Sequence, residues 1–165
     1  MKILLGRDDV NPDKPDNDGR TPLWRAAYCG HEGVVKILLR RDGIKPDKPD
    51  NVSRTPLFMV ACCGWERVVK MLLVQGVKSD KPNINGRTPL HLAAWNGLNK
   101  VVKILLRQDN ANPNELDKGG IPPLARATEN GHQEVIALLQ PPRTCGPQPV
   151  TRTRGHYPPT VFECQ

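Results

Sequence analysis

Histidine and cysteine are the residue types of this chain that could act as nucleophiles, general bases or metal ligands, and there are only four His and five Cys. Zinc ligands recur at short spacings such as His-x-x-His or Cys-x-x-Cys, and neither spacing occurs in the sequence. A catalytic thiol also needs a histidine that activates it, and none is placed to do so for Cys29, Cys62 or Cys63. We therefore expect no metal site and no cofactor.

Carboxylates are more frequent, but most of them lie in turn-forming segments: Asp8, Asp9, Asp13, Asp16, Asp18, Asp47 and Asp50. A catalytic carboxylate pair requires one acid in a dry pocket, which separates the two pKa values. We expect these aspartates to be exposed instead. No glycine-rich phosphate loop is present, because Gly119-Gly120 has the character of a turn. The sequence thus predicts no catalytic residues and no enzymatic activity.

Composition limits the remaining possibilities. The 165 residues carry a formal net charge of +7, and 38% of them are hydrophobic. Positive charge favours nonspecific attraction to nucleic acid or anionic membrane, but acids are interleaved throughout, which indicates a solvated surface. No apolar run reaches the length of about 18 residues that a membrane helix needs. We expect a cytoplasmic protein, with the nucleus as an alternative, and reduced cysteines.

The strongest regularity is a recurring Thr-Pro-Leu tripeptide. It begins at Thr21, Thr55 and Thr88, and a degenerate copy begins at Pro122, so the steps are 34, 33 and 34 residues. A period of this length is typical of stacked supersecondary units, each too small to bury its own apolar face. Such stacks offer a surface, and seldom an enclosed pocket.

Each unit has the same predicted elements. In the first, residues 16–20 form a turn, Thr21 caps a helix, and Pro22 suits its first position because the missing N–H has no partner there. Gly30 ends this short helix, and residues 34–39 form a second, strongly apolar helix. A loop with two prolines, residues 44–49, connects it to the next unit.

This pattern is similar to that of ankyrin repeats over residues 1 to about 140. The segment Thr88-Pro89-Leu90-His91-Leu92-Ala93-Ala94 matches the helix-opening motif without a gap. The loops at 11–16 and 45–50 resemble those of tandem ankyrin arrays of filamentous fungi. The resemblance implies an all-α fold, an ankyrin-repeat solenoid of helix-turn-helix units with hairpin-like loops. It also implies structural roles for the histidines: turn hydrogen bonds at His31 and His132, and bonds from His91 to Thr88 and nearby backbone.

The repeat pattern predicts the following divisions. We expect a partial repeat at 1–15, ankyrin repeats at 16–49, 50–82 and 83–116, a C-terminal repeat at 117–140, and a Pro-rich disordered tail at 141–165. Because Lys2-Ile3-Leu4-Leu5 aligns with Lys36-Ile37-Leu38-Leu39, the chain is predicted to open within a second helix. We interpret it as a truncated product or one end of a longer array.

The resemblance also implies where partners bind. Hairpin tips and first helices of ankyrin repeats line a concave surface that binds proteins. Carried over by position, the partner-binding residues are Arg20, Tyr28, Cys29, Arg54, Cys62, Cys63, Arg87, Trp95, Asn96, Glu129 and Asn130. Exposed Trp, Tyr and Arg are enriched in binding hot spots. Three of the arginines form a row that suits an acidic strip on a partner.

Several residues depart from the family pattern. Trp24, Phe58 and Ala125 stand where the motif has His, and Trp65 and Leu98 replace the His after the turn glycine. Arg25 and Arg126 occupy positions that are usually apolar, and a buried unpaired arginine is costly. We expect these arginines either to extend outward or to loosen their layers.

We therefore predict a non-catalytic module that binds a protein partner through the concave face, as a monomer or as part of a longer chain. The alternative is a fragment of a longer multidomain protein, in which the repeats are a scaffold or an autoinhibitory spacer. A third hypothesis is charge-driven binding to nucleic acid or membrane, which would weaken steeply with salt.

Overall fold

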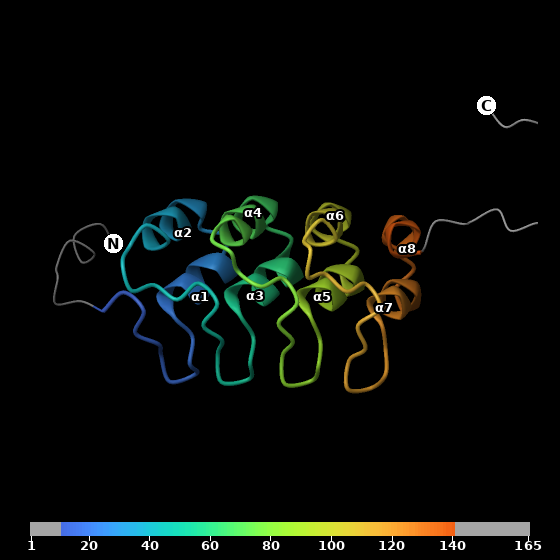
Figure 1. Ribbon diagram of the computed structural model, residues 1–165, viewed down its shortest axis with the longest axis horizontal. Coiled ribbons are helices and arrows are strands. Elements are labelled where there is room, and N and C mark those ends of the chain that lie inside the picture. The colour runs from blue at the N-terminus through green and yellow to red at the C-terminus, as the bar shows by residue number, and fades with distance from the viewer. Residues whose placement is uncertain (1–10, 141–165) are drawn as a thin grey trace, which may run out of the picture.

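The computed structural model describes residues 11–140, and this part of the chain folds into four stacked pairs of short helices (Figure 1). The pairs are α1 (Pro22–Tyr28) and α2 (Glu32–Leu38), α3 (Pro56–Cys63) and α4 (Glu66–Val74), α5 (Pro89–Trp95) and α6 (Asn99–Leu105), α7 (Pro123–Glu129) and α8 (Gln133–Leu139). No strand occurs among these residues. The all-α repeat fold expected from the sequence is confirmed.

The first helix of each pair starts as its sequence predicts. The side-chain oxygens of Thr21 and Thr55 accept hydrogen bonds from the backbone N–H groups of Trp24 and Phe58, at 3.1 and 3.2 Å. A proline follows each of these threonines at the first helical position, where no N–H partner is lost. These caps fix where α1 and α3 begin and therefore which side chains they expose; α7 begins in the same way with Pro123 at its first position but without a side-chain cap.

The helices form two rows (Figure 1). The inner row is α1, α3, α5 and α7, the outer row is α2, α4, α6 and α8, and neighbours within each row are in contact. Leu23, Leu57, Leu90 and Leu124 each hold the second position of an inner helix. The first three are buried and Leu124 is half-buried against the same core. The four leucines thus contribute to one continuous apolar core between the rows.

Hairpin-like loops extend from the inner row and share one turn geometry (Figure 1). In each, a side-chain oxygen of Asp16, Asp50, Asn83 or Asp117 accepts backbone N–H bonds from the residues two and four positions later. Single backbone bonds then join successive tips: Asn51 N to Asp18 O, Ile84 N to Val52 O, and Lys118 N to Asn85 O. The inner helices and their loops therefore form one connected surface, which we call the inner face.

Two sequence expectations fall outside the described residues. These are the partial second helix at the start of the chain and the Pro-rich tail at 141–165. Within residues 11–140, no helix is long and apolar enough to cross a membrane.

Candidate interaction surface

The residues predicted to bind a partner all lie on the inner helices, at their C-terminal ends, or directly before them. Tyr28 and Trp95 remain 43% and 40% exposed, so two large aromatic rings are available to a partner on this face. Cys29, Asn96, Glu129 and Asn130 are exposed, while Cys62 and Cys63 are half-buried. Contacts between α1, α3, α5 and α7 bring the candidates together along one row.

The arginine row is only half exposed, because each arginine already has a carboxylate partner. Arg54 pairs with Asp50 at 2.7 Å, and that aspartate side chain is almost fully buried. Arg20 pairs with Asp18 at 2.8 Å. The expectation that turn aspartates are exposed is therefore wrong for Asp50, and also for Asp13, which pairs with Lys48. Asp50 is buried because one of its oxygens binds the Arg54 guanidinium while the other closes the turn.

Arg87 behaves differently because the turn residue of its own repeat is the neutral Asn83. Its Nε donates instead to Asp117 of the next repeat, at 3.4 Å. Arg126 donates to the same carboxylate oxygen at 2.6 Å and also pairs with Glu129 at 3.2 Å. Arg126 is buried and paired, so it neither extends outward nor lacks a partner; Arg25, in the same position of the first repeat, is exposed and pairs with Asp16.

Asp117 is the most strongly perturbed carboxyl of this surface. Burial alone would raise the pKa of Asp117, but hydrogen bonds from Arg126 and from the N–H groups of Ile121 and Gly119 outweigh it. Together they hold the pKa of Asp117 well below its usual range. The carboxylate is consequently charged at neutral pH, where it links two arginines of different repeats.

The arginines of the inner face lie in two clusters, each around the ring of one tryptophan. The Trp24 ring has Arg20, Arg25 and Arg54 within 5.2–5.9 Å of its centroid. The Trp95 ring has Arg87 and Arg126 at 5.8 and 5.2 Å. Such cation–π contacts hold the guanidinium groups in place.

The acids named above balance these arginines. Asp16, Asp18 and Asp50 match the three cations at Trp24, while Asp117 and Glu129 match the two at Trp95. The inner face therefore has fixed, charge-balanced arginines and two exposed rings.

A second set of contacts closes the junctions between repeats at the far ends of the inner helices. The indole N–H of Trp65 donates to Tyr28 O at 3.0 Å, and His132 Nε2 lies 2.8 Å from Trp95 O. At the middle junction Leu98 has no donor, and the amide of Asn96 donates to Cys62 O at 3.2 Å instead. His132 thus makes a hydrogen bond, as expected, but to the preceding repeat, whereas within residues 11–140 the His31 side chain makes none. Trp65 replaces the family His with another donor, and at the middle junction Asn96 supplies the bond that Leu98 cannot.

His91 and Trp24 play matching roles in different repeats. Nδ1 of His91 accepts from the Thr88 N–H at 3.1 Å, so its Nε2 carries the proton and donates to Ile121 O of the next repeat at 3.1 Å. The indole N–H of Trp24 donates in the same way to Arg54 O at 2.9 Å. Burial lowers the pKa of His91, which keeps the imidazole neutral in this structural role.

The three thiols that lie within residues 11–140 give no indication of catalysis or metal binding. Cys29, Cys62 and Cys63 are free, and burial raises the pKa of Cys63, as do the neighbouring Cys62 and Cys29 thiols. A raised pKa leaves the thiol protonated and weakly nucleophilic. Among residues 11–140 no group of three His, Cys, Asp or Glu side chains could hold a metal ion.

The stacked helix pairs, the bonded loop tips and the exposed inner face define a helical repeat protein of the solenoid class. Two family matches agree with this architecture: a profile described as "Ankyrin repeats (3 copies)" matches residues 43–117, and one described as "Ankyrin repeat" matches residues 18–51. Together they span residues 18–117, more than half of the 165. No curated protein matches the chain.

The chain belongs to the ankyrin repeat family. Proteins of this family are generally protein–protein interaction modules and typically have no catalytic activity. The fourth helix pair, α7 and α8, lies beyond the matched residues but has the same turn, the same inner-row packing and the same junction bond.

Proposed function

We propose that this protein is a non-catalytic adaptor that binds a protein partner through its inner face, the face expected to be concave, and that it acts in the cytoplasm. The observation that carries the proposal is the exposure of Tyr28 on α1 and Trp95 on α5, two inner helices separated by α3, beside arginines already held in place. Tyr and Trp supply large contact areas at little entropic cost, and prealigned arginines lose little freedom on binding.

The charge balance refines the kind of partner that fits. A partner carboxylate would have to compete with Asp50 and Asp117 for the arginines, so a uniformly acidic strip gains little on this face. The surface suits a partner with apolar or aromatic groups for Tyr28 and Trp95, and with hydrogen-bond acceptors for the N–H groups of Arg54 and Arg87 that Asp50 and Asp117 do not bind. This partner chemistry differs from the acidic strip that the arginine row suggests in the sequence.

The test compares captured proteins quantitatively on the purified full chain, on Tyr28→Ser/Trp95→Ser, and on Val74→Ser. Val74 is an exposed apolar residue of the outer row, so its variant identifies losses of captured protein that do not depend on the inner face. We expect proteins that wild type and Val74→Ser retain and that the inner-face variant loses. Thermal melts of all three establish that the fold is intact. Equal capture by all three would refute the assignment to the inner face.

A further inference from the structure

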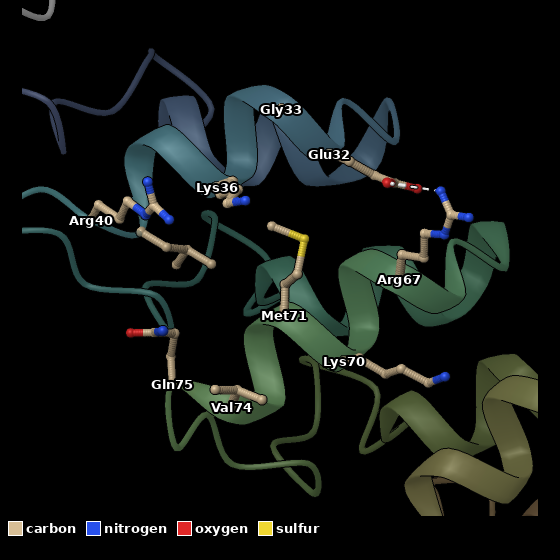
Figure 2. A pocket seen from close by; sticks show the side chains of 10 residues that line it. Glu32, Gly33, Lys36, Arg40, Arg67, Lys70, Met71, Val74 and Gln75 are labelled. Carbon is tan, nitrogen blue, oxygen red and sulfur yellow. Dashed lines mark hydrogen bonds and ion pairs between the residues drawn. The ribbon is translucent and has the colours of Figure 1, made fainter.

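An open groove lies between α2 and α4 of the outer row, on the side of the stack away from the loop tips (Figures 1 and 2). Its volume is about 630 Å³. Leu39, Met71 and Val74 supply its apolar lining, and Met71 reaches from α4 towards α2 (Figure 2). The inner-face residues discussed above do not line it, so it is a separate surface.

The groove carries uncompensated positive charge, unlike the inner face. Lys36, Arg40, Arg67 and Lys70 line it together with one acid, Glu32. Glu32 pairs with Arg67 at 3.4 Å at one end of the groove (Figure 2). Lys36, Arg40 and Lys70 are exposed and make no ion pair with other residues in the 11–140 range. Three cations therefore surround an apolar lining, and none of them has a carboxylate partner within residues 11–140.

The apolar lining comes from residues that differ from their equivalents in the neighbouring repeats. Val74 stands where those repeats have Arg40 and Arg107, and Met71 stands where they have Ile. α4 also continues two residues further than the equivalent ends of α2 and α6, which makes Val74 helical. Val74 is 82% exposed. This repeat therefore exposes an apolar side chain to solvent at a position where its neighbours have a charged arginine.

From these features we propose that the groove binds an acidic amphipathic helix of a protein partner. Packed helices lie about 8–10 Å apart, so a third helix can rest its apolar side chains between α2 and α4. Its acidic flanks would then face Lys36 and Arg40 on one side and Lys70 on the other. Met71 suits such an occupant because its flexible thioether adapts to different apolar side chains. This is the helix-in-groove mode of recognition, with charge complementarity selecting the partner.

The experiment uses a fluorescent synthetic helix of about four turns, with leucines on one face and glutamates on both flanks. Fluorescence anisotropy against the full chain measures its affinity. Lys36→Glu/Arg40→Glu should weaken binding about tenfold or more. Val74→Asp should weaken it as well, because it removes apolar contact and repels the glutamates. All substituted side chains are exposed, and circular dichroism checks that the variants fold.

The chain offers a matched control. Lys103→Glu/Arg107→Glu makes the same substitutions at the same repeat positions on and just after α6, outside the groove. It should leave the peptide affinity unchanged, as should Tyr28→Ser/Trp95→Ser, which separates this site from the proposed function of the inner face. A control peptide with serines in place of leucines and the same charge should bind much more weakly.

Several results would overturn the proposal. If the α6 variant weakens binding as much as the α2 variant, the peptide responds to overall charge and not to the groove. If the leucine and serine peptides bind equally, the apolar lining has no role. Vesicles of phosphatidylserine and phosphatidylcholine that bind the chain more tightly than the peptide, with the same loss in Lys36→Glu/Arg40→Glu, would assign the groove to a membrane surface.

Discussion

Asp117 shows how a single carboxylate can fold a loop and join two repeats. One of its oxygens accepts the N–H groups of Gly119 and Ile121, and the other accepts Arg126 and Arg87. Turn composition alone gave no sign of this burial, because aspartate is common in exposed turns. A usable signal was present, however: Arg126 follows Asp117 by the same nine residues that separate Arg25 from Asp16.

The lowered pKa of Asp117 predicts a pH dependence of stability. An aspartate whose pKa is lower in the folded than in the unfolded state stabilises the folded protein. This stabilisation is present at pH values above the pKa of the unfolded-state aspartate, near 3.9. We expect the free energy of unfolding to fall as the pH decreases below about 4, because the unfolded state then takes up the proton first. Urea unfolding at a series of pH values measures this slope.

The variant Asp117→Asn isolates that carboxylate. At pH 7 it should destabilise the protein by about 2 kcal/mol or more, because buried Arg126 loses its charged acceptor. It should also show a shallower loss of stability in acid than wild type. A slope equal to that of wild type would mean that other carboxylates, such as Asp16, cause the acid effect.

Gly97 supports a second prediction at the scale of one residue. Its φ is +66°, and an added Cβ would lie 2.5 Å from Nδ1 of His132 in the next repeat. Gly97→Ala should therefore cost about 2 kcal/mol or more. Gly33→Ala is the matched control, because it lies within α2 with no atom near its added Cβ, and it should stabilise the chain by up to about 1 kcal/mol. Thermal melts of both variants distinguish these outcomes, and destabilisation by both would contradict the argument.

At the scale of elements, the junction between helix pairs depends on one donor from the later pair. Trp65 provides it for the first junction while its ring covers Gly30. We expect Trp65→Phe to cost about 1 kcal/mol, because Tyr28 O loses its bond, and Trp65→His to cost less because a ring N–H remains. Chemical denaturation compares the two. Equal losses would show that ring packing over Gly30 matters more than the hydrogen bond.

The helices themselves could be predicted almost completely from the sequence. Thr-Pro starts, glycine ends and apolar spacing depend on neighbouring residues, and these fixed the existence and order of the helices. The contacts between repeats could not be predicted, because Arg87–Asp117 and Trp24–Arg54 join residues about one repeat apart. The sequence analysis also did not single out Val74, which is helical and exposed in the structure. Its unusual character is evident only from a comparison with Arg40 and Arg107, the residues at the equivalent positions of the neighbouring repeats.

At the scale of the whole molecule, each helix pair packs mainly against its immediate neighbours, so stability is shared along the stack. Leu72 lies fully buried in α4, with a helix pair on both sides, whereas Leu139 lies in α8, the last described pair. We expect Leu72→Ala to cost about 3 kcal/mol and Leu139→Ala clearly less.

Hydrogen exchange provides the measurement for this comparison. Leu72→Ala should accelerate amide exchange in α1 to α6, whereas Leu139→Ala should accelerate it mainly in α7 and α8. Identical, uniform acceleration by both variants would instead indicate a single cooperative unit with no distinction between centre and end.

The junction carbonyls have a consequence for how this surface can change during evolution. An indole, a carboxamide and an imidazole satisfy three equivalent acceptors, and the carboxamide does so from a different position in its repeat. Because the carbonyl at each junction can accept a hydrogen bond from any of these donors, substitutions at the donor positions can change the exposed side chains of a repeat. The hydrogen bond between neighbouring repeats is kept. Duplicated copies of one template could in this way diverge in specificity without first losing their fold.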